Sequence, residues 1–369
     1  MLSINFKRYI TIGLLIVLLS SIQGYQAQEN NDSLIPQSKN TEIIFTMDFD
    51  EEWTENSFDG YSSPPGWTIQ GITSGHQENN RKLTHYWSRV DKDFSYTHTL
   101  WESSPISQPY VYSGDGAAFI WGNDGNQESA IQSDRSDEWL ISPTLDFSSY
   151  YNIELSFWSI YVPTQRITLP FPLVISVDNQ YLFKTSTNDG TTWKKNADLR
   201  TDSYKFGVNN YLDVYNKYDE QIKIDLDQFR GQDDIRLAWN YLYDGNGTGD
   251  LWVIDDIQIH AQYDSFAPDI EIVKPKKDNL YILDATVIPM SGKTIVIGPV
   301  DIVVDPTDEG TGTKSVEFYK DNTLVYTDTE YPFSWNWKQL GFGSSTIKTV
   351  AYDYAGNSNH DQITLFKIF

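Results

Sequence analysis

The adjacent acidic residues Asp255 and Asp256 are the feature of this sequence that most directly indicates chemistry. They follow the apolar run Leu251–Ile254, which has the composition of a strand. Neighbouring side chains on a strand point to opposite faces, so one carboxylate is expected to face the core or a closed pocket. A buried carboxylate is costly unless a cation or several donors satisfy it. Hard oxygen ligands in a chain without cysteine suit Ca²⁺, although a salt bridge or a solvated pair remains an open alternative.

Other acidic motifs have the composition of turns. In Asn188–Thr191, the Asp-Gly pair supplies the positive φ angles of a tight hairpin, and Asp353–Asn357 is expected to form a similar turn. The Gly-rich segment Tyr243–Asp250 has spaced acidic residues but lacks the bidentate glutamate of an EF-hand loop. We therefore interpret all three as turns or loops.

Catalytic signatures are absent from the sequence. It contains no H-E-x-x-H, G-x-S-x-G or P-loop pattern, and no cysteine nucleophile. The five histidines are scattered singly, at His76, His85, His98, His260 and His360. Paired carboxylates for glycoside hydrolysis remain an open alternative, because 51 acidic residues produce chance pairs.

Aromatic side chains are the other candidates for ligand contact. The chain has 12 Trp, 24 Tyr and 18 Phe, most of which are expected in the core. Trp87, Trp101 and Trp121 fall in a region rich in predicted loops and are candidates for stacking on a sugar. The alternative is that these three tryptophans pack in the core like most of the other aromatic residues.

The N-terminus has the pattern of a secretory signal peptide over residues 1–27. Lys7 and Arg8 precede the apolar run Ile10–Leu19, which is shorter than the ~20 residues of a spanning helix. A polar leader follows over 28–41, and no later segment is long and apolar enough to be transmembrane. Signal removal leaves 25 basic against 51 acidic residues, a formal charge of −26. Such a charge disfavours nucleic acid and anionic membranes as partners.

The body of the chain is predicted to be all-β. Short apolar runs alternate with Gly, Asn and Asp clusters, as in Ile153–Trp158, Ile222–Leu226 and Ile235–Trp239. Residues 42–263 are too long for a minimal sandwich, so we expect a jelly roll with long loops at 71–110 and 198–220.

A domain boundary is predicted between Asp264 and Pro268, where polar residues and a proline interrupt the pattern. Residues 268–369 are about the size of one immunoglobulin-like sandwich. Seven strands are expected there, at Ile270–Val273, Thr294–Ile297, Val300–Val304, Ser315–Tyr319, Thr323–Thr327, Thr346–Tyr352 and Gln362–Ile368.

The first of these regions resembles the cleaved-adhesin / choice-of-anchor J group, which is related in architecture to MAM domains. The resemblance rests on Asp48-Phe49-Asp50 with Pro65-Gly66-Trp67, on Asp137–Asp146, on Ser186–Trp193 and on Trp252–Ile257. It spans roughly residues 45–260. One position departs from the family pattern. The family has a second glycine in its Asp-Gly-Gly turn, and this chain has Thr191 at that position.

The second region resembles prokaryotic Ig-like domains of surface proteins. The matching segments are Lys314–Asn322, Tyr331–Trp335 and Ala351–Asn357. This resemblance implies the fold and the role of a spacer, and it does not name a partner.

Together the resemblances imply a secreted or cell-surface adhesion protein that binds an extracellular protein or glycan without turnover. The resemblance to the first group also implies a structural Ca²⁺ site, with Asp50 and Asp256 as first-choice ligands and Asp48 and Asp255 as second choices. Two alternatives stay open, a carbohydrate-binding accessory module of a hydrolase system and a glycosidase or peptidase.

Overall fold

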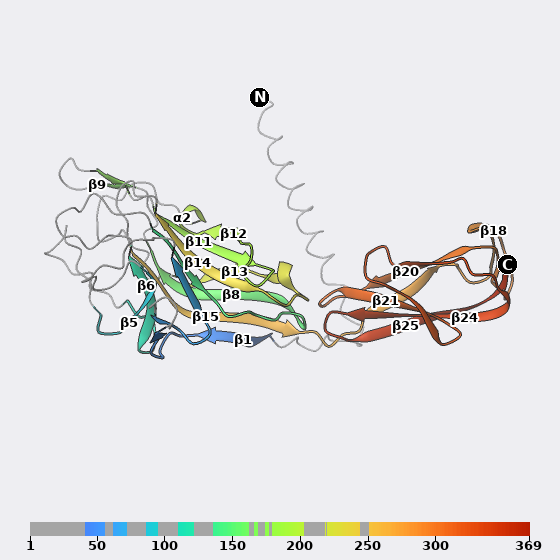
Figure 1. The fold of residues 1–369 in the computed structure, drawn as a ribbon, viewed down its shortest axis with the longest axis horizontal. Helices are drawn as coiled ribbons and strands as arrows, with labels where there is room; N and C mark the ends of the chain where they lie inside the picture. Colours follow the sequence, from blue (N-terminus) through green and yellow to red (C-terminus); the bar gives the residue numbers. More distant parts are fainter. Residues whose placement is uncertain are drawn as a thin grey trace, which may run out of the picture. The chain divides into compact units, whose positions relative to one another are not determined.

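The computed structural model describes residues 41–55, 62–71, 86–94, 110–121, 136–161, 166–168, 174–176, 179–202, 218, 220–243 and 251–369. The described chain is almost entirely β, as predicted, and its main strands form two groups of sheets (Figure 1). We call the group before Asp264 the first sandwich and the group after it the second sandwich. The predicted signal peptide and leader lie outside the described residues, except that Thr41 begins the first strand.

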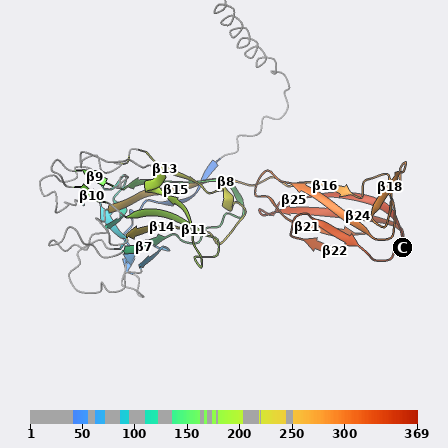
Figure 2. The ribbon, with the colours of Figure 1, turned by 90° about the horizontal axis from the view of Figure 1, so that it is seen from above.

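Two antiparallel sheets form the first sandwich, and Figure 2 shows them as separate layers. One has the order β13-β8-β15-β6-β5, with β1 also paired to β15. Its strands are β1 (Thr41–Met47), β5 (Ser88–Asp91), β6 (Gly116–Trp121), β8 (Tyr150–Ile160), β13 (Ile222–Asp225) and β15 (Leu251–Tyr263). The other, of order β12-β11-β14-β7-β4, consists of β4 (Thr68–Gly71), β7 (Ser136–Ile141), β11 (Gln180–Ser186), β12 (Lys194–Asp198) and β14 (Arg236–Tyr243).

The remaining elements of this part are short. They are β2 (Thr54–Glu55), β3 (Ser62–Ser63), β9 (Arg166–Thr168), β10 (Val174–Ser176), the helix α2 (Leu199–Asp202) and the 3₁₀ turn η3 (Asp227–Phe229). In the described part of the chain, no helix is long and apolar enough to cross a membrane.

Alternating side chains fill the space between the two sheets. Leu155 and Phe157 of β8 face Leu237 and Trp239 of β14, and all four are fully buried. This is the period-2 pattern of the sequence, because every second residue of a strand lies on the same face. Aromatic rings dominate this core, with Trp239 in contact with Phe157 at a centroid distance of 5.6 Å.

Strand β6 is buried on both faces. Ala118 and Ile120 belong to the main core, whereas Ala117 and Phe119 belong to a second, outer cluster. Tyr110 is part of the same outer cluster, and its ring lies 5.8 Å from that of Phe119. The outer cluster therefore anchors the segment that leads into β6.

The predicted loop at 71–110 is partly wrong. Ser88–Asp91 forms β5 and pairs with β6, with Val90 in the outer cluster. Its Ser-Arg-Val-Asp sequence contains one apolar residue, which is too little for an alternating pattern. The Asp-Gly hairpin between β11 and β12 is confirmed, with φ angles of 51° at Asp189 and 85° at Gly190.

The second sandwich packs a three-stranded sheet, β16-β20-β23, against a seven-stranded sheet, β18-β17-β19-β25-β24-β21-β22. Val304, Trp335, Phe318 and Ile347 are among the residues of its core. The strands are β16 (Asp269–Lys274), β17 (Asn279–Ile282), β18 (Ala285–Pro289), β19 (Ile295–Ile297), β20 (Val300–Thr307), β21 (Thr313–Lys320), β22 (Thr323–Asp328), β23 (Ser334–Trp337), β24 (Phe342–Asp353) and β25 (Ser358–Ile368). All seven predicted strands are present, and β17, β18 and β23 are additional.

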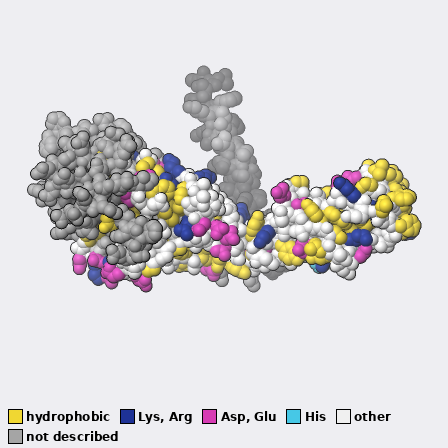
Figure 3. Space-filling model, viewed as in Figure 1, with side chains coloured by type: hydrophobic (Ala, Val, Ile, Leu, Met, Phe, Trp, Pro, Cys, Tyr) yellow, Lys and Arg dark blue, Asp and Glu magenta, His cyan; other side chains and the backbone are white. Residues whose placement is uncertain are grey.

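Charge is distributed rather than concentrated. Figure 3 shows acidic side chains in small scattered groups on the visible face, and basic side chains lie among them. The acidic side chains on this face therefore need no special role beyond that of a solvated surface. The exceptions are carboxylates that the fold buries.

Candidate functional site

A β-bulge brings both carboxylates of the Asp255-Asp256 pair to one segment. The pairing of β15 with β8 shifts register between Asp255 and Gln258, and Asp256 has a φ of 46°. Asp255 is buried and Asp256 is only partly buried, as expected for a pair with one carboxylate toward the core, although the bulge interrupts the regular alternation of the strand here. Both carboxylates accept hydrogen bonds from residues of the segment 110–116, which we call the 110s loop.

Asp255 is the most deeply buried carboxylate of this group, with no exposed surface. Its Oδ2 accepts hydrogen bonds from the backbone N–H of Tyr112 at 2.7 Å and of Ser113 at 3.3 Å. Its Oδ1 accepts one from the N–H of Asp256 at 2.8 Å. Burial raises the pKa of Asp255 to about 7, the charge of Asp256 adds to the rise, and the backbone donors oppose it.

Asp256 lies nearer the surface and is linked to the other predicted ligands. The Ser113 hydroxyl donates to its Oδ2 at 2.8 Å. Burial is the main cause of its raised pKa, and the charges of Asp48 and Asp50 raise that pKa further. Asp256 is therefore coupled to Asp48 and Asp50 on one side and to Asp255 on the other, and the pairing of Met47 in β1 with Ile257 in β15 brings the two chain segments together.

Asp50 is held against the opposite end of the 110s loop. Its Oδ1 accepts hydrogen bonds from the N–H groups of Asp115 at 2.5 Å and Gly116 at 3.0 Å. Asp48 in turn accepts a bond from the N–H of Asp50 at 3.1 Å. Gly114, with a φ of 67°, lies so close that a Cβ built on it would sit 2.2 Å from an Asp50 oxygen. The close packing of Asp50 against the loop thus requires glycine.

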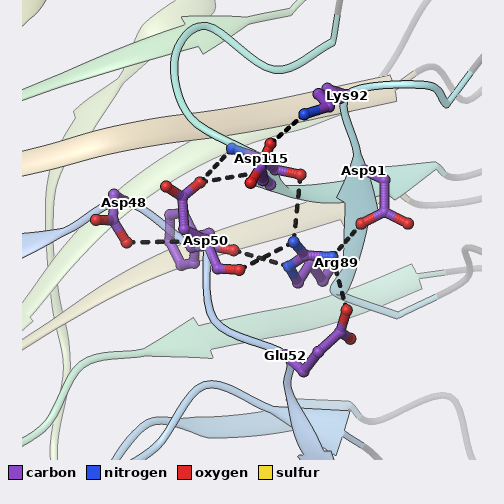
Figure 4. A network of polar contacts seen from close by, with 9 residues as sticks. Asp48, Asp50, Glu52, Arg89, Asp91, Lys92 and Asp115 are labelled. Atoms are coloured by element: carbon purple, nitrogen blue, oxygen red, sulfur yellow. Dashed lines mark hydrogen bonds and ion pairs between the residues drawn. The ribbon is translucent and has the colours of Figure 1, made fainter.

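Arg89 of β5 fixes the backbone around Asp50 (Figure 4). Its Nε donates to the carbonyl of Phe49 at 2.9 Å, and its Nη2 donates to the carbonyls of Asp50 at 3.0 Å and Asp115 at 3.2 Å. Its ion pairs go to Asp91 and Glu52. Arg89 therefore positions the site without bonding to the carboxylates of Asp48, Asp50, Asp255 or Asp256.

The charge balance of this group is consequently negative. Within the described ranges, no Lys, Arg or His side chain bonds to any of the four carboxylates. The donors they do have are backbone N–H groups and one hydroxyl. Carboxylate oxygens are ligands of the kind that Ca²⁺ takes. Three carboxylate oxygens within 4.8 Å of one another occur elsewhere in the described chain, at Asp264, Asp308 and Asp353. Among the described residues, the carboxylates around Asp255 do not form such a three-oxygen group. An ion at Asp50, Asp255 and Asp256 would therefore need neutral oxygen ligands as well.

An aromatic surface adjoins the site. The ring of Tyr112 stacks on that of Trp158 at 4.0 Å and 15°, while 43% of Tyr112 remains exposed. Tyr218 contacts Tyr112 edge-on at 5.3 Å, and its hydroxyl donates to the carbonyl of Tyr110 at 2.6 Å. A partly exposed aromatic ring therefore lies on the loop whose N–H groups bind Asp255.

The three tryptophans that were predicted to contact a sugar lie in different environments. Trp87 is wrong as a ligand-binding residue, because it is fully buried, packs on Trp252 at 5.2 Å and donates to the carbonyl of Glu138. Trp101 lies outside the described residues, as do His76, His85 and His98, and Trp121 is described only as the end of β6.

Sequence reasoning missed three contributors to this region. Ser113, Gly114 and Arg89 have no motif around them, and they meet the aspartates only through long-range pairing. The one available signal was the Ser-Gly-Asp-Gly composition of residues 113–116, which is typical of a tight loop.

Comparison with known proteins identifies part of the chain. Residues 286–351 match the family model described as Bacterial Ig domain, in agreement with the predicted fold of the second sandwich. No curated protein matches the chain.

Solved structures resemble the chain at low similarity. The K1 cleaved adhesin domain of Lys-gingipain from Porphyromonas gingivalis W83 is 11% identical, with a TM-score of 0.31, over 61% of this chain and 99% of that one. The CBM22-1 xylan-binding domain of Paenibacillus barcinonensis Xyn10C is 12% identical, with a TM-score of 0.27, over 62% and 99%. The glycoside hydrolase domain of Endo-D from Streptococcus pneumoniae R6 is 12% identical, with a TM-score of 0.28, and this chain spans 43% of its length. Scores this low carry no argument about function.

Proposed function

We propose that this chain is an exported binding protein without catalytic turnover, whose first sandwich is a jelly roll of the cleaved-adhesin / choice-of-anchor J type. Its 110s loop contacts an extracellular protein or glycan, and a Ca²⁺ ion at Asp50, Asp255 and Asp256, with Asp48 beside them, holds that loop. The second sandwich is a spacer. The cell surface or the medium is its location.

The observation that carries this proposal is the environment of Asp255. The side chain has no exposed surface and carries three backbone hydrogen bonds, yet no basic group among the described residues bonds to it. A buried carboxylate in this state is stabilised either by a proton or by a cation. The neighbouring Asp256, Asp50 and Asp48 supply further oxygen ligands, so a cation accounts for the whole group.

Binding is favoured over catalysis by the same residue. A carboxyl group with a pKa near 7 has the acidity that general acid–base catalysis uses. A catalytic group must reach the substrate, however, and Asp255 is fully buried behind the N–H groups of Tyr112 and Ser113. Its altered acidity is therefore better suited to a structural role.

A carbohydrate is the second candidate ligand, and the exposed ring of Tyr112 favours it. Aromatic faces contribute apolar contact to ligand sites, and stacking on Trp158 fixes the orientation of this ring. Under this second proposal the chain is a carbohydrate-binding accessory module. The calcium-held 110s loop then presents the ring of Tyr112 to the sugar.

The test is binding of the purified chain to glycan and extracellular-protein arrays, in Ca²⁺ and in EDTA. We expect binding in Ca²⁺ that is lost in EDTA and in Tyr112→Ala. Tyr263→Ala is the matched control, because Tyr263 is a similarly exposed tyrosine on β15 and lies beyond the site. Binding that survives both EDTA and Tyr112→Ala contradicts the proposal, as does hydrolysis of a bound glycan.

A further inference from the structure

A second group of carboxylates, two of them buried and one partly buried, lies where the chain leaves the first sandwich. Asp264 follows β15, Asp308 follows β20, and Asp353 ends β24. One oxygen from each lies within 4.8 Å of the others. Asp264 and Asp353 are at most 1% exposed. None of the three belongs to the site described above.

Each carboxylate accepts hydrogen bonds that fix its position. Asp264 Oδ2 accepts hydrogen bonds from the N–H and the hydroxyl of Thr311, both at 2.7 Å. Asp308 Oδ2 accepts bonds from the N–H groups of Gly310 and Gly312 at 3.0 and 2.7 Å. Asp353 accepts bonds from the N–H and the side-chain amide of Asn357 at 2.7 and 2.8 Å. The three groups are therefore preorganised.

A separate observation points to a ligand. Asp308 Oδ1 is buried and has no hydrogen-bond partner among the described residues. The charges that act on Asp308 are those of Asp264 and Asp353, both negative, and they raise its pKa together with burial, which is the largest cause. No basic side chain of the described chain bonds to any of the three carboxylates. An unpaired oxygen in such surroundings is costly without a cation.

The spacing fits one ion. Oxygens that share a Ca²⁺ ion at about 2.3–2.6 Å lie no more than about 5 Å apart, and the three oxygens here meet that limit. We propose that a Ca²⁺ ion binds between Asp264, Asp308 and Asp353 and ties the segment after β15 to two loops of the second sandwich. The same segment is anchored on its other side, because the N–H of Asp264 donates to the carbonyl of Ser149 at 2.9 Å. The ion thus acts as a clip on the connecting segment.

Asp264 also approaches the loop closely at Gly310. A Cβ built on Gly310 would lie 2.2 Å from an oxygen of Asp264, so the loop admits only glycine there. That contact leaves the carboxylate of Asp264 directed at the loop that carries Asp308 and Thr311. Metal binding at preformed oxygen ligands stabilises the folded state by an amount that grows with the logarithm of the free ion concentration.

The test is calcium stoichiometry of the metal-stripped full chain, measured by equilibrium dialysis and by calorimetric titration with CaCl₂. We expect Asp308→Asn to bind one ion fewer than the unmodified chain. Asp305→Asn is the matched control, since Asp305 is an exposed residue of β20 outside the cluster, and it is expected to bind as the unmodified chain does. Circular dichroism shows whether each variant is folded. Equal stoichiometry in Asp308→Asn and the unmodified chain overturns the proposal and leaves a shared proton as the partner of Asp308.

The two calcium proposals are separable in the same experiment. Asp256→Asn removes a ligand of the first site and leaves the second intact. Loss of an ion in Asp308→Asn but not in Asp256→Asn supports the clip and contradicts the first site. Loss of an ion in Asp256→Asn but not in Asp308→Asn supports the first site and overturns the clip. A second readout is hydrogen exchange at residues 308–312, which Ca²⁺ is expected to slow in Asp256→Asn but not in Asp308→Asn. Exchange at 308–312 that ignores Ca²⁺ in a folded Asp256→Asn chain also overturns the clip.

Discussion

At the scale of single residues, Asp255 differs from most of the acidic residues of this chain. Its Oδ1 and Oδ2 accept backbone N–H bonds, and burial rather than any neighbouring charge is the main cause of its raised pKa. The backbone donors reduce the cost of burial without neutralising the charge. The charge of Asp255 is therefore neutralised by a proton or by a cation. Protonation is favoured at low pH, whereas cation binding is favoured at high pH.

In the metal-free protein, stability is expected to fall as the pH rises from about 4 to about 7. The folded pKa of Asp255, about 7, lies above the ordinary value of 3.8, so the folded state holds a proton that the unfolded chain releases in this window. A difference of about three units corresponds to about 4 kcal/mol. Urea unfolding in a chelator at several pH values checks this, with Asp255→Asn expected to flatten the decline. An unchanged slope in that variant would contradict the assignment.

Gly114→Ala is expected to destabilise the protein by about 1–3 kcal/mol and to weaken Ca²⁺ binding at the first site. The added Cβ meets the Asp50 carboxylate, and the positive φ of Gly114 adds strain. Gly292→Ala is the control, because Gly292 has a similar φ of 72° with nothing within 4 Å, so only the strain of about 1 kcal/mol remains. Chemical denaturation measures both. Equal losses in the two variants would show that contact with Asp50 is unimportant.

At the scale of elements, the sequence predicts best the strands that are buried on one face. All seven predicted strands of the second sandwich are present because their alternation reflects real burial, as in β21 with Val316 and Phe318 inside. β18 was missed because all five of its residues are exposed, so burial leaves no pattern. The bulge at Asp255 and Asp256 was missed for a different reason. It depends on pairing with β8, which local sequence does not encode.

Trp239 of β14 is expected to be the most sensitive single position of the first core. Its ring lies within 6 Å of those of Trp67, Phe157 and Phe183, so Trp239→Ala removes contacts with both sheets and should cost about 3–5 kcal/mol. Trp239→Phe should cost clearly less. The indole N–H has no hydrogen-bond partner among the described residues, so only volume is lost. Thermal unfolding of the two variants checks the order. A larger loss for phenylalanine would contradict this description of the core.

At the scale of the whole molecule, the chain lacks disulfides and carries a formal charge of −24. On the face that Figure 3 shows, the acidic side chains lie in small scattered groups. Two groups of carboxylates, one at the 110s loop and one at the connecting segment, contain the buried residues Asp255, Asp264 and Asp353. The sequence predicted a structural Ca²⁺ site through the Asp255-Asp256 pair and the resemblance to the first family. The first group includes the predicted aspartates, whereas the second combines residues from three distant segments, of which only Asp353 lay in a motif, interpreted as a turn.

The whole chain is therefore expected to melt at a lower temperature in EDTA than in Ca²⁺. An ion present at 100 to 1,000 times its Kd contributes about 3–4 kcal/mol to the folded state. Calorimetry of the full chain measures the shift, and Mg²⁺ is expected to restore it poorly, because it demands a stricter geometry. A melting temperature that is the same in EDTA and in Ca²⁺ would contradict stabilisation by calcium.

Hydrogen exchange of the 110s loop tests the central claim most directly. The measurement follows the backbone amides of Tyr112 and Ser113, which donate to Asp255, in metal-free and calcium-loaded full chain. Exchange is predicted to slow on addition of Ca²⁺ in the unmodified chain and in Asp308→Asn. In Asp256→Asn it is predicted to be the same with and without the ion. Equal exchange with and without Ca²⁺ in the unmodified chain would contradict a calcium-held binding loop.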